Sequence, residues 1–141
     1  MIIFFDTNIL LDVLLRRKPY DAAALQLWFL AETDAVDSAV AAISFNNVYY
    51  VARQVADRNK AIESVRLIRG VFEIIPVDER ILDQAMNSKI SDFEDAIQYF
   101  CAVRAGADYL VTRNISDFPK RGMPIVSPEE MLALLAANPS S

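Results

Sequence analysis

The chain has 141 residues, of which 54% are hydrophobic and 23% charged, so it carries enough apolar material to bury the core of one compact domain. It contains no histidine and one cysteine, which excludes a Ser-His-Asp or Cys-His catalytic set, a clustered Cys/His zinc site and an internal disulfide. The formal net charge of -5 argues against a uniformly basic face that coats nucleic acid. Any chemistry must therefore come mainly from carboxylates.

The N-terminal apolar run covers only residues 1–5 and meets an acid at Asp6, so we expect neither a signal peptide nor a membrane span there. No other apolar run approaches the length that a membrane helix needs. Cys101 lies in the apolar run 99–103, which is typical of a small buried hydrophobic residue. Together these features predict a cytoplasmic protein without a membrane segment.

In the first half of the chain, apolar periodicity predicts strands that alternate with helices. The expected elements are, in order, a strand over 2–5, a helix from Ile9 to before Arg16, a helix over 21–32, a strand within 36–43, a helix from Ser44 to near Asp57, a helix over 60–69 and a strand over 71–75. Asp21 and Ser44 are the expected N-caps of their helices, and Gly70 is the expected C-terminal stop.

The second half continues the same alternation. Its expected elements are a helix capped by Asp78, a helix opened by Ser91 and closed by Gly106, strands over 109–111 and 124–126, and a helix that Ser127 caps and Pro128 begins. The buried stripe of the helix after Ser91 should consist of Phe93, Ala96, Ile97, Phe100 and Cys101. The alternation predicts an α/β fold with a mainly parallel sheet, in a single domain over 1–141 with residues 137–141 as a frayed tail.

Polar residues follow two of the buried strands, and in an open α/β sheet ligands bind at such strand ends. Asp6 follows the first strand, Thr112, Asn114 and Asp117 follow the strand over 109–111, and Asp92 and Asp95 open the helix before it. Asp95 is expected to point partly into the cleft, whereas the other acids of these segments also have a purely structural interpretation. Asp6 can cap a helix, Asp92 and Glu94 suit a first helical turn, and Asp117 can start a turn.

Carboxylates that converge on one crevice repel one another, and a divalent cation relieves that repulsion. Because the chain offers no histidine and no accessible thiol cluster, hard ions with oxygen ligands are favoured. Mg²⁺ or Mn²⁺ can bind a few carboxylates together with a phosphate and can activate a water for attack on phosphorus. The sequence therefore favours phosphoryl chemistry that needs no imidazole.

Three segments, residues 4–12, 91–96 and 110–119, resemble the PIN-domain nucleases in the branch of the VapC toxins, and the similarity runs in order from about residue 2 to residue 130. The resemblance implies a three-layer α/β/α fold and a Mg²⁺- or Mn²⁺-dependent endoribonuclease of a toxin–antitoxin pair, with RNA as substrate, a small antitoxin as partner and a homodimeric assembly. It implies the following roles: Asp6, Asp95 and Asp117 as catalytic metal-site acids, Asn114 beside them, Asp92 as an accessory metal-site acid, and Thr7, Asn8 and Thr112 as residues that orient the ligands.

One position departs from the family pattern. PIN domains usually carry an acid early in the third helix, and the match through residues 48–50 places Asn47 there. An asparagine can coordinate a cation through its carbonyl oxygen or position a water, but it brings no charge. The resemblance therefore predicts that the site holds its cation less tightly than usual.

Basic and aromatic residues near the expected site offer RNA contacts. Arg16, Arg53 and Arg113 are the candidates for phosphate contacts, although solvated surface residues would have the same pattern. The pair Tyr49-Tyr50 is more typical of a core or a dimer interface than of a platform on which bases stack.

Two other functions remain open at the level of sequence. A PIN fold that binds RNA or protein without cleaving is consistent with the neutral Asn47. A phosphatase of the haloacid-dehalogenase type would use Asp6 as a nucleophile at the end of the first strand. That family requires a second acid two residues later, where this chain has Asn8.

Overall fold

A single sheet of five parallel strands forms the centre of the protein, for which a computed structural model describes residues 1–137. The strands are β1 (Ile2–Phe5), β2 (Asp37–Ala41), β3 (Glu73–Ile75), β4 (Tyr109–Val111) and β5 (Ile125–Val126). Their order across the sheet is β3-β2-β1-β4-β5, and every neighbouring pair is parallel. The strand order reverses at β1, so the crevice between the carboxyl ends of β1 and β4 is the place where such sheets bind ligands.

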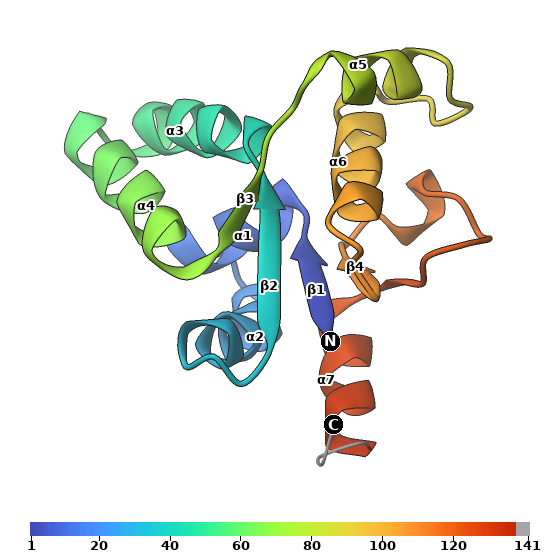
Figure 1. Ribbon diagram of the computed structural model, residues 1–141. Helices are drawn as coiled ribbons and strands as arrows, with labels where there is room; N and C mark the ends of the chain where they lie inside the picture. Colours follow the sequence, from blue (N-terminus) through green and yellow to red (C-terminus); the bar gives the residue numbers. More distant parts are fainter. Residues whose placement is uncertain (138–141) are drawn as a thin grey trace.

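Helices cover both faces of this sheet, as Figure 1 shows. They are α1 (Thr7–Leu14), α2 (Asp21–Glu32), α3 (Ile43–Val55), α4 (Arg58–Val71), α5 (Glu79–Met86), α6 (Phe93–Arg104) and α7 (Pro128–Ala137), with a 3-10 turn η1 (Ile115–Asp117). Side chains of β1 alternate between the two layers, because Ile3 and Phe5 join one buried cluster and Phe4 joins the other. The three-layer α/β/α arrangement confirms the predicted fold class.

The two buried clusters hold different helices against the sheet. The first contains residues of α1, α2, α3, α4 and α7, and its aromatic centre is Phe72, whose ring lies 4.9 Å from Phe5 and 5.0 Å from Trp28 between ring centroids. The second contains residues of α5 and α6, including Cys101, which is fully buried as predicted. No helix among residues 1–137 is long and apolar enough to cross a membrane. The predicted single domain over 1–141 stays a prediction.

Three predicted helix boundaries were wrong in the first half of the chain. Ser44 lies inside α3 and not at its N-cap, because its buried hydroxyl bonds to side chains of other helices. Gly70 does not end α4, which continues to Val71 so that Phe72 reaches the aromatic centre. Asp21 is the first residue of α2, and its carboxylate pairs with Lys18 at 3.2 Å instead of capping the helix.

The start of α6 also differs from the prediction. The N-cap is Asp92, not Ser91, because the Asp92 Oδ1 accepts a hydrogen bond of 2.9 Å from the backbone N–H of Asp95. Phe93, predicted to be buried, is 49% exposed, whereas the polar Gln98, which was not predicted to be buried, is fully buried. Ala137, which was predicted to belong to a frayed tail over 137–141, is the last residue of α7, and residues 138–141 lie outside the described residues.

The predicted capping box of α7 is present and provides a test of stability. The Ser127 hydroxyl accepts from the Glu130 N–H at 3.1 Å, and the Glu130 carboxylate accepts from the Ser127 N–H at 3.2 Å. Ser127→Ala removes the first bond, so we expect a loss of about 1 kcal/mol in the free energy of unfolding. Urea unfolding followed by circular dichroism measures this loss. A variant that unfolds at the wild-type midpoint would show that the cap does not contribute.

Candidate metal-dependent active site

Asp6 lies at the carboxyl end of β1, where its side chain is fixed on both oxygens. The backbone N–H of Thr7 donates to its Oδ1 at 2.8 Å, and the Thr112 hydroxyl donates to its Oδ2 at 2.8 Å. The parallel register that pairs Phe5 with Val111 brings Thr112 beside Asp6. Asp6 is therefore both the N-cap of α1 and a buried acid at the crevice, and the two interpretations of this residue are compatible.

Burial raises the pKa of Asp6 to about 6, although its hydrogen bonds from Thr112 and Thr7 oppose the rise. The charge of Glu94 adds to the increase, and that of Arg113 lowers the pKa. A carboxylate with two hydrogen bonds that still has an elevated pKa lies in a strongly desolvated place. A bound cation would favour its charged form.

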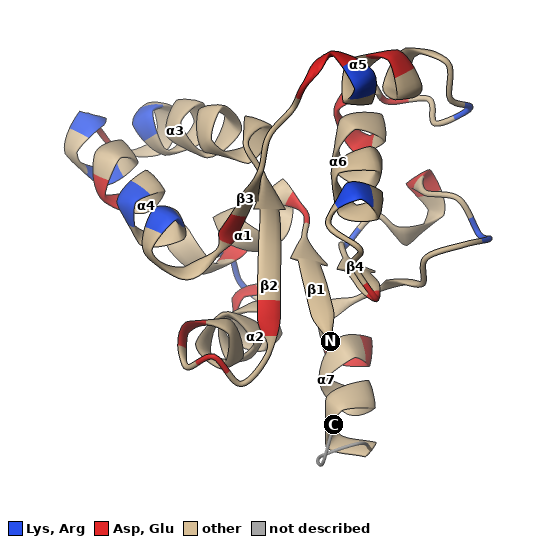
Figure 2. Ribbon diagram, in the orientation of Figure 1, with Lys and Arg blue, Asp and Glu red and all other residues tan. Residues whose placement is uncertain are grey.

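The N-terminus of α6 brings further acids to the same crevice. Burial is the largest cause that raises the pKa of Asp95 to about 7, and the charges of Asp6, Asp92, Asp117 and Glu94 contribute to the same rise. These four acids come from the end of β1, the start of α6 and η1, so segments far apart in sequence direct negative charge at one side chain. Figure 2 shows acidic segments at the upper end of β1 and at the start of α6.

The segment after β4 supplies the outer part of the crevice. Asn114 and Asp117 are exposed, and the backbone N–H of Asn114 donates to the Thr112 hydroxyl at 3.1 Å. Phe118, which follows η1, is buried in the second cluster and attaches this segment to the fold. Asp117 is thus placed at the rim of the crevice, where its charge acts on Asp95.

A layer of buried hydroxyl and amide groups lies beneath the acids. The hydroxyls of Thr7 and Ser44 are 2.8 Å apart, and the Gln98 Nε2 donates to them at 2.9 Å and 3.0 Å respectively. These three fully or nearly fully buried residues join α1, α3 and α6. Thr7 was expected to orient the site, whereas Ser44 and Gln98 were not predicted to take part.

The remaining accessory residues lie nearby on α1 and α3. Asn8 is half-buried, and its Oδ1 accepts from Arg17 at 3.5 Å. Asn47 is half-buried on α3, and its Nδ2 is buried without a hydrogen-bond partner among the described residues. The side chains of Asn47 and Thr7 lie beside Glu94 and lower its pKa.

Glu94, like Ser44 and Gln98, lies at the candidate site and was not predicted from the sequence to belong to it. It is half-buried, and its pKa is raised by burial and then by the charge of Asp92. The sequence contains one relevant signal: Glu94 precedes Gln98 by four residues, so the two side chains share a face of α6. Gln98 is a polar residue between the apolar pairs Ala96-Ile97 and Cys101-Ala102, which marks its face as pointing to other polar groups.

The basic residues predicted to contact RNA have different surroundings. Arg16 and Arg53 are exposed, the first just after α1 and the second in the last turn of α3. Arg113 instead binds the fully buried Asp12 through Nε at 2.7 Å and Nη2 at 3.0 Å, and its guanidinium stacks on Tyr20 at 3.9 Å. Arg113 therefore has a structural partner that the sequence did not reveal.

The donor set fits a hard divalent cation, although its ligands are not already gathered around one point. Among residues 1–137, no three Asp, Glu or Cys side chains are close enough together to hold a metal ion. The nearby donors are carboxylate, amide and hydroxyl oxygens, which Mg²⁺ and Mn²⁺ prefer. Burial is the main cause that raises the pKa of Asp6 and of Asp95, and a cation beside these two carboxylates would favour their charged forms.

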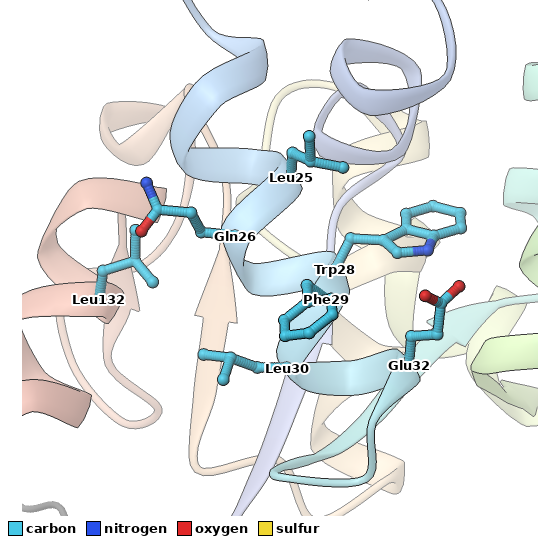
Figure 3. Close-up of a pocket in the computed structure, with 7 residues that line it drawn as sticks. All are labelled: Leu25, Gln26, Trp28, Phe29, Leu30, Glu32 and Leu132. Carbon is cyan, nitrogen blue, oxygen red and sulfur yellow. The ribbon is translucent and has the colours of Figure 1, made fainter.

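An apolar pocket of about 450 Å³ lies elsewhere, between α2 and α7 (Figure 3). Its lining residues are Leu25, Gln26, Trp28, Phe29, Leu30, Glu32 and Leu132. None of the site acids lines this pocket, so it does not belong to the candidate active site.

Comparison with known families decides the assignment of the fold. A family model described as the PIN domain matches residues 2–116. The chain belongs to the PIN-domain family. The resemblance to PIN domains that the sequence shows is thereby confirmed. The alternative, a phosphatase of the haloacid-dehalogenase type, depended on the first strand alone, and this PIN domain belongs to a different family.

Known relatives of this PIN domain include a curated protein and several solved structures. Ribonuclease VapC1 of Aquifex aeolicus (strain VF5) is 23% identical over 133 residues, which cover 91% of each chain. The structure of VapBC2 from Rickettsia felis, bound to a promoter DNA fragment, matches with a TM-score of 0.67 at 19% identity and covers 90% of this chain and 98% of that chain. A toxin–antitoxin complex from Klebsiella pneumoniae matches with a TM-score of 0.64 at 24% identity, covering 89% and 96%. At these identities the structural matches establish a shared fold.

Proposed function

We propose that this protein is a metal-dependent endoribonuclease of the VapC type and the toxin of a toxin–antitoxin pair. The observation that carries the proposal is the convergence of charge on Asp95, which Asp6, Asp92, Asp117 and Glu94 all act upon. The convergence lies where the strand order reverses, as expected for a ligand site in this kind of sheet. The name of the Aquifex aeolicus relative, a ribonuclease, supports RNA as the substrate class.

Each proposed site residue has a position that suits its role. Asp6 and Asp95 are the inner ligands, and Thr112 and the Thr7 N–H hold Asp6 in one orientation. Asp117 and Asn114 lie on the exposed rim, where a substrate phosphate can approach. Asp92 holds the first turn of α6 through its bond to the Asp95 N–H, so we propose that it is a positioning residue and an accessory acid.

The cation that we propose is Mg²⁺ or Mn²⁺. When bound, it supplies Lewis-acid activation of a water and offsets the negative charge of the phosphate. The chain itself contributes the oxygen ligands and a partly desolvated crevice, in which electrostatic interactions are stronger than in water. Since the chain contains no histidine, carboxylates are its main candidates for accepting a proton near neutral pH.

The proposed partners are RNA, a small antitoxin and a second copy of this chain. A solved structure of the same fold, from Klebsiella pneumoniae, is a toxin–antitoxin complex, which supports the antitoxin. Single-stranded RNA or an RNA loop suits a crevice with an exposed rim, because a splayed backbone lets one phosphate enter. The homodimer and the cytoplasmic setting stay predictions.

Asp6→Asn is expected to reduce Mn²⁺-dependent RNA cleavage by at least about 100-fold. Removing a group that only hydrogen-bonds to a metal ligand typically lowers metal affinity or activity by about 10- to 100-fold, and removing the ligand itself should have a larger effect. Asparagine also caps helices well, so the variant should fold. The assay follows a labelled single-stranded RNA with Mn²⁺ and with EDTA, and Glu79→Gln, an exposed first-turn glutamate of α5, is the matched control. Equal cleavage by Asp6→Asn and wild type would contradict the proposal.

A second candidate function is an RNA- or protein-binding PIN module without nuclease activity. Asn47 favours it, because this residue brings no charge where the family usually has an acid, and three ready-placed ligands are absent among the described residues. The same assay separates the two functions. Binding of the labelled RNA without any cleavage in Mg²⁺ or Mn²⁺ would support the binding module.

A further inference from the structure

We propose that Glu94 supplies, from α6, the metal-site carboxylate that Asn47 does not supply from α3, and that Asn47 is a positioning residue for Glu94. The inference rests on the proposed function, because it assumes a divalent cation at the crevice. It adds a site acid to the set expected from the sequence. It also gives the asparagine a role in an active enzyme.

The buried polar layer sets the register of the two helices. Gln98 on α6 donates to Ser44 on α3 at 3.0 Å, and both residues are fully buried. Asn47 follows Ser44 by three residues, and Glu94 precedes Gln98 by four, so each pair occupies one helix face. The contact between Ser44 and Gln98 therefore directs Asn47 and Glu94 toward the same part of the site, one helical turn away from that contact on each helix.

The buried group of Asn47 is its amide nitrogen, which can donate a hydrogen bond to a carboxylate but cannot bind a cation. Its Nδ2 is a donor, is inaccessible to solvent and has no acceptor within hydrogen-bonding geometry among the described residues. Leaving a buried donor unpaired destabilises the protein, and a carboxylate beside the donor can accept its hydrogen bond after a small side-chain movement. Glu94 is the acid that lies beside this amide.

Glu94 also lies within the field of the two inner acids. Glu94 and Asp95 are neighbours in the first turn of α6, and Thr7, whose side chain lies beside Glu94, donates its backbone N–H to Asp6, so the three carboxylates share one region. Three carboxylates carry more charge than one divalent cation neutralises, and a fourth on α3 would add repulsion. An acid at position 47 is therefore unnecessary in a chain that has Glu94.

The test measures Mn²⁺ binding to the full chain by isothermal titration calorimetry, without any RNA. Glu94→Gln is expected to weaken Mn²⁺ affinity by about 10- to 100-fold, and the double variant Glu94→Gln/Asn47→Glu should return to within about 3-fold of wild type. The double variant moves the carboxylate from α6 to α3 and keeps the total charge. Glu79→Gln, which removes a comparable first-turn charge from α5, should bind Mn²⁺ as wild type does.

Two results would overturn the inference. One is wild-type Mn²⁺ affinity in Glu94→Gln. The other is a double variant that unfolds at the wild-type temperature and yet binds Mn²⁺ no better than Glu94→Gln. Asp6→Asn distinguishes this failure from failure of the proposed function: if Asp6→Asn loses Mn²⁺ and Glu94→Gln does not, the metal site stands without Glu94. If neither variant changes Mn²⁺ binding, the proposed metal site fails as well.

Discussion

Arg113→Met is expected to lower the free energy of unfolding by about 2–4 kcal/mol, because it leaves the buried carboxylate of Asp12 without its main partner. Asp12 is fully buried, and both of its oxygens accept from Arg113, at 2.7 Å and 3.0 Å. Arg17 compensates only in part, because its Nη1 lies 3.9 Å from the Asp12 Oδ1 and is not hydrogen-bonded to it in the way that Arg113 is. The variant also removes the guanidinium from the ring of Tyr20.

The loss should shrink in acid, since Asp12 can then become neutral. Burial already raises the pKa of Asp12 while Arg113 opposes the rise, so removal of Arg113 lets that pKa rise further. Below this higher pKa the buried group no longer carries an unpaired charge. The difference between variant and wild type should therefore be larger at pH 7.5 than at pH 4.5.

Urea unfolding at both pH values measures the effect, and two further variants control it. Arg121→Met removes an exposed arginine of the same segment and should change stability by no more than about 0.5 kcal/mol. Arg113→Met/Asp12→Leu removes both charges, so it should be more stable than Arg113→Met alone. If Arg113→Met unfolds at the same urea concentration as wild type at pH 7.5, the ion pair between Arg113 and Asp12 does not stabilise the fold.

The sheet could be predicted from sequence because its strands carry local signals. Residues 2–5 and 109–111 are apolar runs that end in polar residues, and both are strands with those bounds. Parallel pairing of two neighbouring strands brings the residues that follow them together, and the pairing of β1 with β4 places Thr112 beside Asp6. That polar residues gather at the strand ends was therefore predictable, whereas the order of the strands comes from the structure.

The other site contacts depend on pairings that no local pattern encodes. Gln98 meets Thr7 across 91 residues, and Arg113 meets Asp12 across 101 residues. Each of these polar residues resembles an ordinary surface position when it is viewed within its own helix or loop. Glu94 was missed because a glutamate in the first turn of a helix already has a sufficient structural explanation through the helix dipole.

Asp95→Asn is expected to abolish metal-dependent cleavage and, in the metal-free protein, to stabilise the fold by about 1–2 kcal/mol at pH 7.5. The shift of the Asp95 pKa from 3.8 to about 7 corresponds to a larger energy, which partial exposure to solvent reduces. The cap of α6 remains, because Asp92 binds the backbone N–H of residue 95 and not its side chain. The substitution therefore removes repulsion without removing a structural contact.

The sign of the pH dependence follows from the direction of the shift. A folded-state pKa above the unfolded value means that the folded protein binds the proton more tightly, so the stabilisation is complete below about pH 4 and is lost as the pH rises through about 7. Asp6, with its pKa raised to about 6, contributes in the same direction. Metal-free wild type should thus lose stability between pH 4 and pH 7.5, and Asp95→Asn should lose less.

Thermal unfolding in EDTA from pH 4 to pH 8 tests this expectation, with an increase of about 3–6 °C in the melting temperature of Asp95→Asn at pH 7.5. Asp83→Asn, an exposed acid of α5, should leave the melting temperature unchanged. Added Mn²⁺ should reverse the order, because a ligand that binds only the folded wild type stabilises it and not the variant. A metal-free Asp95→Asn that melts below wild type at pH 7.5 would mean that Asp95 makes a favourable contact, and the crevice would then not be a site of uncompensated charge.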